Sequence, residues 1–527
     1  MHFIKYLQIL LVMFLMSIPA LPQEKRTTLE IEQTMLKATQ YMVDKVSTNG
    51  GYLWYYLPDM SRRWGEMEAY ESMIWIQNPG TVSMGHLLLD AYHATEDPYY
   101  YHAAQKAANA IIWGQSQHGG WNYMIDFAGD RSLKKWYSTI GKNGWRLEEF
   151  QHYYGNSTFD DDVTSDAARF LLRIYLEKLD PSYKPSLDKA IVFILESQYP
   201  NGGWPQRYPL KYDFNKHGNP DYTSFYTFND DVIWENIHFL IQCYLYLGEE
   251  RFLDPIYRGM NFYLISQDEC GAWGQQLDMN MKAAGARTYE PAAFMPTTTF
   301  TNAMLLLRFY QFTGDRKFLT RIPDAIKWLE KVKLTEDRIE QGRTHPMYID
   351  IKTNNPVYVH RMGSNVKYGK YYIDENNENL LAHYKGICTI DIEQLKNDYQ
   401  RVLQLPLEEA VKNSPLRADI FEDNSKTQNF FDLNKTDPQM QVNDKLVNDI
   451  KDALDEQNRW LTKHASISNP YIGDGQKQEL TSKYASTLVG DETDTSPYRD
   501  NSDQLYISTG EYIRNMEMLI HYINSMK

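Results

Sequence analysis

Hydrophobic residues recur at helical spacing through most of the chain, in pairs of segments joined by short breaks. In one pair, an apolar stripe begins after Thr158 and stops at Asp180-Pro181, and a second stripe runs from Leu187 to Leu195. Apolar positions three or four residues apart indicate amphipathic helices, and a proline after an aspartate separates one helix from the next. This stretch therefore predicts a helical hairpin, with Thr158 as N-cap and Asp161 in the capping-box position.

The hairpin is one of four similar units, each about 60 to 85 residues long. The units share a Thr-led helix start and an Asp-Pro break, and three of them continue to a Gln followed by Gly-Gly-Trp or Gly-Ala-Trp. Such repetition is typical of stacked helix-turn-helix units. We expect the glycine to end a helix in the left-handed conformation and the tryptophan to pack between repeats. The motif tryptophans are Trp121, Trp204 and Trp273.

The same patterns predict the helices and strands on either side of the repeats. Residues 28–48 read as an amphipathic helix, and residues 345–375 alternate in the manner of strands. Residues 406–505 are polar, with one helix expected near 442–461. A last amphipathic helix covers residues 512–523, and because its apolar stripe needs a partner we expect it to dock on the repeats.

Together these elements predict an all-α fold, a partial α/α toroid of repeated helical hairpins with a small appended β-hairpin. We assign residues 28–405 to the toroid. Residues 406–527 form a C-terminal extension, made of a polar segment and the docking helix.

Composition and the N-terminus narrow the possible roles. The net charge of the 527 residues is −15, and no basic stripe is present, which disfavours nucleic acid as a partner. Lys5, the apolar run 9–18 and Ala20 indicate a signal peptide over residues 1–22, too short to span a membrane. We therefore expect a secreted or periplasmic protein, and we also expect a monomer. The three cysteines allow one disulfide or three core thiols.

Acidic residues gather at two neighbouring helix starts. Asp160, Asp161 and Asp162 lie in one turn, and Asp230 and Asp231 lie at the same place one repeat later. Capping by the helix dipole, worth roughly 0.3–1 kcal/mol each, explains one or two acids per helix but not this matched set. Because equivalent positions of stacked repeats adjoin, we expect four of these carboxylates to converge and to hold Ca²⁺, while Asp162 points to solvent or caps its helix.

The middle Gly-Gly-Trp loop carries extra candidates. It reads Asn201 to Pro209 and contains Trp204, Arg207 and Tyr208. Aromatic faces stack on sugar rings, and a guanidinium pairs with a carboxylate through two hydrogen bonds. Trp204 and Arg207 therefore suit a uronic acid chain.

Five segments carry a resemblance to a known family, and three of them contain the acidic and aromatic motifs. Residues 201–209, followed by Thr227-Phe228-Asn229-Asp230-Asp231, resemble the pectate lyases of polysaccharide lyase family ten, over about residues 30–405. Thr158 to Thr164 occupies the family's first acidic motif, in which Asp160 matches the functional aspartate and Asp161 replaces an asparagine. Asp230 or Asp231 matches the second functional acid.

Two arginines are implied by the same resemblance. Thr353 to Arg361 matches the family's late segment, and this match places Arg361 at the position of the catalytic base. The position of a further arginine of the family falls near Met347, where this chain lacks it. The segment 286–291 also resembles the family, so Arg287 is a candidate for binding the substrate carboxylate.

The resemblance implies a secreted pectate lyase with an α/α toroid that cleaves polygalacturonate, or a related uronic acid polymer, by Ca²⁺-dependent anti β-elimination. In that role Asp160, Asp161, Asp230 and Asp231 hold Ca²⁺, while Arg207, Arg287, Trp204, Asp160 and Asp161 contact the substrate. Two alternatives remain: a non-catalytic carbohydrate-binding toroid, and a terpene-cyclase-like enzyme suggested by the Gln-x-Gly-Trp repeats with acidic runs. Export argues against the second, because an apolar prenyl substrate needs no secretion.

Overall fold

The computed structural model describes residues 23–143, 148–211, 221–287, 289–362, 370–378, 380, 386–417, 442–465 and 503–527. The expected signal peptide at residues 1–22 and much of the polar stretch after residue 417 lie outside these residues.

Helices dominate the described chain. They are α2 (Gln23–Tyr41, extended by a π turn over Met42–Val46), α3 (Thr81–Thr95), α4 (Pro98–Trp113), α5 (Asp130–Thr139), α6 (Val163–Lys178), α7 (Lys184–Ser197), α8 (Val232–Leu247), α9 (Leu253–Ile265), α10 (Pro296–Thr313), α11 (Ile322–Val332), α12 (Ile392–Gln404), α13 (Leu407–Val411), α15 (Asp444–Asp452) and α16 (Thr509–Met526).

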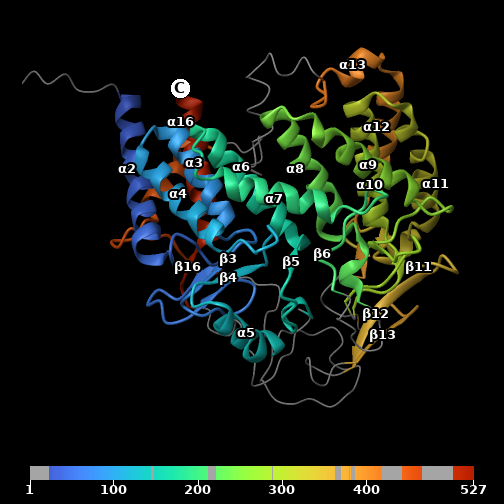
Figure 1. The fold of residues 1–527 in the computed structure, drawn as a ribbon, viewed down its shortest axis with the longest axis horizontal. Helices are drawn as coiled ribbons and strands as arrows, with labels where there is room; N and C mark the ends of the chain where they lie inside the picture. The colour runs from blue at the N-terminus through green and yellow to red at the C-terminus, as the bar shows by residue number, and fades with distance from the viewer. Residues whose placement is uncertain are drawn as a thin grey trace, which may run out of the picture.

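The helices pair as antiparallel hairpins, α3 with α4, α6 with α7, α8 with α9 and α10 with α11. Figure 1 shows these hairpins following one another along an arc, with α2 and α16 at one end and α11 and α12 at the other. We call the first helix of each hairpin its inner helix; α3 contacts α6, α6 contacts α8, and α10 also contacts α12. The predicted all-α partial toroid is confirmed. No helix of the described residues is long and apolar enough to cross a membrane.

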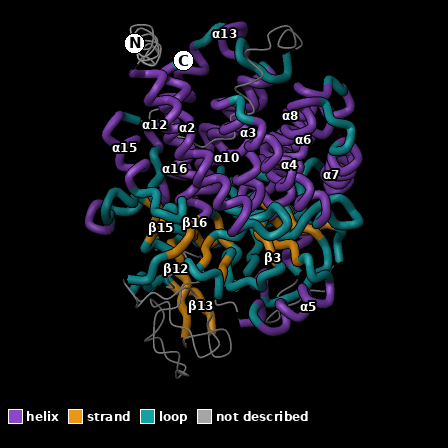
Figure 2. The backbone as a smooth tube through the Cα atoms, turned by 90° about the vertical axis from the view of Figure 1, so that its left-hand side faces the viewer, coloured by secondary structure: helices purple, strands orange, loops and turns teal. Residues whose placement is uncertain are grey.

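Short strands lie together at one end of the helices, as Figure 2 shows. They are β1 (Tyr55–Tyr56), β2 (Arg63–Trp64), β3 (Met73–Trp75), β4 (Met124–Asp126), β5 (Ser157–Thr158), β6 (Arg207–Tyr208), β7 (Tyr226–Thr227), β8 (Gln276–Leu277), β9 (Ala293–Phe294), β10 (His345–Pro346), β11 (Tyr348–Asp350), β12 (Pro356–Met362), β13 (Lys370–Asp374), β14 (Ile387–Cys388), β15 (Leu461–Thr462) and β16 (Tyr506–Ser508).

Three antiparallel strand pairs each join the two ends of one helical hairpin. In β3–β4, β5–β6 and β7–β8, a strand that leads toward an inner helix pairs with the strand that follows a motif tryptophan. This pairing holds each helix start beside the next Trp loop, so polar residues of both segments meet at the strand-bearing end. The expected β-hairpin is present as β12–β13 and belongs to a four-stranded sheet in the order β13-β12-β11-β9.

The Trp motif is a turn between the second helix of a hairpin and the strand that follows it, and not a helix cap. Helix α4 ends at Trp113, well before Gly119, so the expected left-handed helix end is wrong. Instead Gly202 approaches the next outer helix so closely that a Cβ atom would lie 2.1 Å from the carbonyl oxygen of Arg258. The positive φ of 99° and this contact both require glycine at position 202.

A further copy of the motif lies in the C-terminal extension. The indole Nε1 of Trp121, Trp204 and Trp273 donates to the carbonyl ten residues earlier, and Trp460 does the same to Ile450 at 2.9 Å. Asn458, at φ 64°, replaces the glycine two residues before the tryptophan. This turn explains why α15 ends at Asp452, although the sequence predicted a helix up to residue 461.

The last helix packs against the first two. Helix α16 contacts α2 and α3, and Tyr512 and Thr39 share a hydrogen bond of 2.6 Å between their hydroxyls. Strand β16 lies between β15 and β1 in one antiparallel sheet. The extension is thus tied to the start of the toroid. The three cysteines, Cys243, Cys270 and Cys388, are free thiols.

Deleting residues 506–527 should leave the protein insoluble or much less stable. Met516, Leu519 and Ile523 are fully buried, and burying one such side chain is worth about 1.5–3 kcal/mol. Soluble yield and thermal melting measure the effect. Removing only the exposed residues 525–527 is the control and should change neither. A soluble truncation that melts like the full chain would contradict the docking.

Candidate functional site

Two acidic turns, η4 (Asp160–Asp162) and η6 (Asn229–Asp231), lie in contact at the strand-bearing end. Each contains two consecutive left-handed residues: φ is 49° at Asp161 and 59° at Asp162, and 49° at Asp230 and 54° at Asp231. A non-glycine residue in this region costs roughly 1–2 kcal/mol, and such strain gathers at functional sites. The matched strain makes the two turns the first candidate for a site.

The local geometry corrects one expectation from the sequence. Helix α6 begins at Val163, after the strained turn, so Thr158 is not its N-cap and Asp161 is not in a capping box. Thr158 Oγ1 instead accepts the backbone N–H of Asp160 at 3.1 Å. Thr158 therefore shapes the acidic turn that precedes the helix.

Three of the four predicted carboxylates converge. We call Asp160, Asp161 and Asp230 the rim cluster. Asp160 is 1% exposed, and its Oδ2 accepts a hydrogen bond from the Tyr123 hydroxyl. Its Oδ1 is buried without a donor among the described groups, while the Asp160 and Asp230 carboxyls lie within hydrogen-bonding reach. Two ionised carboxylates this close repel one another, so the pair favours a shared proton or a bound cation. Asp161 is half-buried and accepts from Gln77 Nε2 at 2.9 Å.

Arg287 lies beside the rim cluster but is already paired with protein carboxylates. Its Nε and Nη2 donate to the two oxygens of Glu290 at 2.7 and 2.9 Å, and Nη1 donates to Glu149 at 3.4 Å. Nη2 is also 3.7 Å from Asp230 Oδ2. Arg287 is 7% exposed, and the buried Glu290 fixes its orientation. The guanidinium therefore acts first as a counter-ion for the rim cluster.

Sequence reasoning missed three buried acids around the cluster, Glu66, Glu149 and Glu290. The charges of Glu66 and Glu149 both act on Asp161. Spacing could have revealed Glu290, because Arg287 and Glu290 stand three residues apart. Glu66 lies in an aromatic loop with no pattern that marks it.

The cluster carries more negative charge than its surroundings neutralise. Burial raises the pKa of Glu149 to about 8. Burial, followed by the charge of Asp160, raises the pKa of Asp161 and of Asp230 well above the usual range. Burial also opposes ionisation of Asp160, but the charge of Arg287 and several hydrogen bonds bring its pKa below the ordinary value. Without a cation, these acids must share protons.

Arg207 approaches the same region from β6. It is 2% exposed, its Nη2 donates to Asn122 Oδ1 at 2.8 Å, and its guanidinium lies 4.2 Å from the ring centroid of Tyr154. Within the described ranges no carboxylate forms an ion pair with it. A buried guanidinium of this kind can accept an anionic group from a ligand.

Trp204 does not line the site. Its side chain is fully buried, and the indole N–H donates to Ile194 O at 3.0 Å. The prediction that Trp204 stacks on substrate is therefore corrected, because no face of the ring reaches solvent. Trp204 packs between repeats, as the sequence predicted for the equivalent Trp121 and Trp273.

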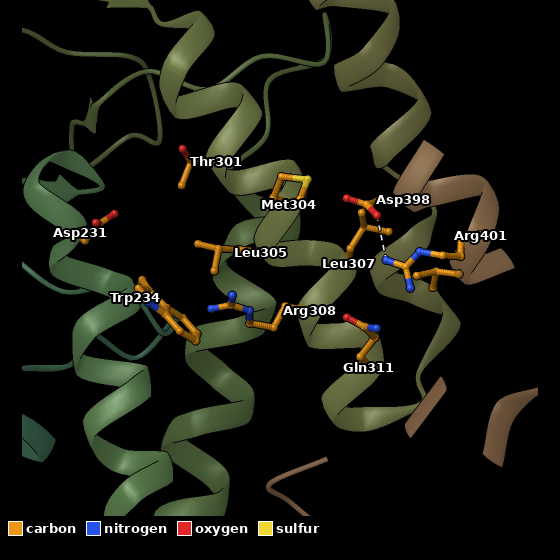
Figure 3. Close-up of a pocket in the computed structure, with 11 residues that line it drawn as sticks. Asp231, Trp234, Thr301, Met304, Leu305, Leu307, Arg308, Gln311, Asp398 and Arg401 are labelled. Carbon is orange, nitrogen blue, oxygen red and sulfur yellow. Dashed lines mark hydrogen bonds and ion pairs between the residues drawn. The ribbon is translucent and has the colours of Figure 1, made fainter. Parts of the chain in front are cut away.

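Asp231 also lies away from the rim cluster, so its expected role as a metal ligand is corrected. Two successive left-handed residues turn the chain, and Asp231 faces a separate cavity between α8, α10 and α12, which Figure 3 shows. Asp162 likewise lines a second inner cavity, with Asp166 and Arg169, and makes no capping hydrogen bond. The catalytic candidate Arg361 lies on β12 opposite Tyr371, and its side chain is outside the described residues.

A protein-family comparison decides the family. The model described as pectic acid lyase matches residues 133–405, just over half of the chain. The chain belongs to the pectic acid lyase family. Membership identifies it as a polysaccharide-active enzyme of the lyase type. No curated protein matches it.

Solved structures give weaker likenesses. A variant of the family 10 polysaccharide lyase from Cellvibrio cellulosa, in complex with trigalacturonic acid, is 16% identical over 52% of this chain and 86% of that chain, with a TM-score of 0.34. An α-1,6-mannanase from Salegentibacter sp. is 12% identical over 94% and 99%, with a TM-score of 0.36. A sugar epimerase from a ruminal bacterium is 12% identical over 95% and 99%, with a TM-score of 0.40.

The rim cluster of this pectic acid lyase family member has side chains of the type that bind a hard cation. Asp160, Asp161 and Asp230 supply only oxygen ligands, which Ca²⁺ prefers. The buried Asp160 Oδ1 accepts no hydrogen bond from the residues that the structure describes. In the part of the chain that the structure describes, no three His, Cys, Asp or Glu side chains are already arranged as a metal site. Ion binding would therefore draw the rim carboxylates closer together.

In chelator, the melting temperature of this lyase-family protein should fall by several degrees between about pH 5 and about pH 8. Glu149 has a pKa of about 8 when folded, against an ordinary 4.5. Between these two values, Glu149 is protonated in the folded state and ionised in the unfolded state. Its contribution to stability is therefore fully present below pH 4.5 and is lost as the pH rises to about 8. Scanning calorimetry measures the slope. Glu149→Gln should flatten it, and the exposed control Glu250→Gln should not; equal slopes in both variants would contradict the assignment.

Proposed function

We propose that the protein is a pectate lyase that cleaves polygalacturonate, or a related uronic acid polymer, by Ca²⁺-dependent β-elimination. The observation that carries the proposal is the convergence of Asp160, Asp161 and Asp230 near the buried Arg207. The Arg207 guanidinium lies 5.9 Å from the ring centroid of Tyr123, whose hydroxyl donates to Asp160. The three carboxylates suit a cation, and the Arg207 guanidinium has no carboxylate partner among the described residues. Together they complement a polymer whose units each carry a carboxylate.

The rim cluster would hold the Ca²⁺ ion. When bound, the ion would neutralise a substrate carboxylate and so make the proton on the adjacent carbon easier to remove. Asp160 is anchored by the Tyr123 hydroxyl and Asp161 by the Gln77 amide, so both are pre-positioned. Glu290 holds Arg287 in place, and Arg287 limits the repulsion among the acids.

The elimination itself needs a base and a carboxylate contact. Arg207 is the contact, because its buried guanidinium has hydrogen-bond capacity left after Asn122. Arg361, from β12, would take the proton from C5 of the uronate. The electron pair then forms the C4–C5 double bond as the C4–O bond to the preceding sugar breaks, and that oxygen leaves with a proton from water. An arginine acts as a base only when unprotonated, so activity should rise toward alkaline pH.

Ultraviolet absorbance tests the reaction directly, because the unsaturated uronate absorbs and the substrate does not. Purified protein without residues 1–22 is mixed with polygalacturonate at alkaline pH, with Ca²⁺, with chelator, and with chelator followed by excess Ca²⁺. We expect absorbance to grow only when free Ca²⁺ is present. Growth that persists in chelator would contradict the Ca²⁺ requirement.

The same experiment separates the alternatives. Polymer binding without absorbance would show a non-catalytic carbohydrate-binding protein. The family match favours the lyase over the terpene-cyclase-like alternative. We also propose that residues 1–22 direct export to the periplasm or medium; detection of the uncleaved chain only in the cytosol would contradict this.

A further inference from the structure

The cavity that Asp231 faces is a candidate site separate from the rim cluster. It is a cavity of about 320 Å³ between the first turn of α8, the middle of α10 and the second half of α12. Its polar lining includes Asp231, Arg308 and Gln311, and Trp234 and Met304 provide apolar surface. Figure 3 shows Trp234 and Arg308 pointing toward one another across this space. This combination of one aromatic ring with a few polar groups is typical of small-ligand sites.

Arg308 gives the cavity an available positive charge. The other arginine of the lining, Arg401, is paired with Asp398 at 2.7 Å. Arg308 has no carboxylate within ion-pair distance among the described residues, and its guanidinium lies 5.3 Å from the Trp234 ring centroid. A guanidinium held against an aromatic ring and open to a cavity can bind a ligand carboxylate through two hydrogen bonds.

The remaining lining suits a sugar better than a compact anion. Asp231 and Asp398 would repel a multiply charged phosphate. A sugar with a single carboxylate could pair that group with Arg308 and place its neutral ring beside the two acids. The Trp234 indole is stacked on His238 at 5.2 Å and is thereby held in place. Its remaining apolar surface can contact the C–H groups of a sugar ring, and the Gln311 amide can bind hydroxyls.

The cavity adjoins the rim cluster along the chain. Asp230 belongs to the cluster, and the next residue, Asp231, lines the cavity, so their Cα atoms are about 3.8 Å apart. We propose that this cavity is a second uronate-binding site that needs no cation and takes an acidic sugar through Arg308 and Trp234. It rests on the proposed function only in the choice of a uronate as ligand.

Calorimetric titration of digalacturonate into the full-length mature protein, in buffer with excess EDTA, tests this site. We expect binding to persist in chelator and to weaken about tenfold or more in Arg308→Gln, because the charged hydrogen bonds are lost. Arg308→Lys should retain part of the affinity, and Trp234→Ala should weaken it. Arg316→Gln, an exposed arginine outside the cavity, is the matched control and should bind as the wild type does.

The result is independent of elimination activity. Arg308 is exposed, so Arg308→Gln should fold normally, which thermal melting checks. A lyase-inactive protein that still binds digalacturonate through Arg308 would support the cavity and overturn only the proposed reaction. The absence of binding in chelator, or equal affinity in Arg308→Gln and the wild type, would overturn the second site even if the protein is an active lyase.

Discussion

Replacing Arg361 with lysine should lower the rate of elimination on polygalacturonate on the order of 10³-fold or more, while polymer binding persists. Proton abstraction depends on the position of the basic nitrogen, and the lysine ammonium is a point charge that cannot reproduce the planar guanidinium. The position on β12, within a four-stranded antiparallel sheet, gives the residue a fixed backbone. Initial rates of ultraviolet absorbance and polymer retardation on an affinity gel measure the two effects separately.

The matched control is Arg338→Lys. Arg338 donates to the Tyr358 hydroxyl at 3.0 Å, so it contacts the same sheet without being the proposed base. Its substitution should change the elimination rate little. If Arg361→Lys keeps most of its activity, or if both variants lose activity equally, the base lies elsewhere.

The double substitution Asp161→Asn and Asp230→Asn should abolish Ca²⁺ binding and elimination while leaving the Ca²⁺-free protein at least as stable as the wild type. Burial is the main cause that raises the pKa of both carboxyl groups, and the charge of Asp160 raises it further. Removing both charges therefore relieves repulsion in the folded state and removes two oxygen ligands from the ion. We expect the affinity for Ca²⁺ to fall about 100-fold or more, equivalent to roughly 2.7 kcal/mol.

Titration calorimetry with CaCl₂ and melting in chelator measure these two quantities. Asp231→Asn is the control, because Asp231 lies in the same strained turn but faces the inner cavity. It should leave Ca²⁺ affinity unchanged. Ca²⁺ binding that survives the double substitution would place the ion outside the rim cluster, and equal losses in Asp231→Asn would indicate a damaged turn.

Periodicity was sufficient to predict the repeated hairpins, because each helix must bury one apolar stripe against its neighbours. The C-terminal extension was harder to predict from the sequence. Trp460 repeats the motif of Trp204, but Asn458 and Arg459 replace the two glycines, so only the shared hydrogen bond to the tenth preceding carbonyl reveals the copy. Asparagine tolerates the left-handed conformation, which lets the turn survive without its sequence signature.

For the acidic turns too, the sequence predicted one part of the arrangement and the tertiary structure decided the other. The matched acids at two helix starts predicted a shared site, and Asp160, Asp161 and Asp230 do meet. The sequence could not show that two left-handed residues in succession would send Asp230 to the rim and Asp231 to the inner face. It also placed Trp204 against substrate, whereas the close packing of Gly202 on the next outer helix draws the ring into the core.

The sequence by itself determined the hairpin repeat, the family resemblance and the clustering of acids, because these depend on residue type and spacing along one chain. Only the tertiary structure decided which acids surround the cluster. Glu66, Glu149 and Glu290 come from segments far apart in sequence, and no local pattern relates them. The tertiary structure also paired Arg287 with Glu290 and Glu149 and left Arg207 without a carboxylate among the described residues. Such charge pairing depends on distances across the fold, which spacing along the chain does not encode.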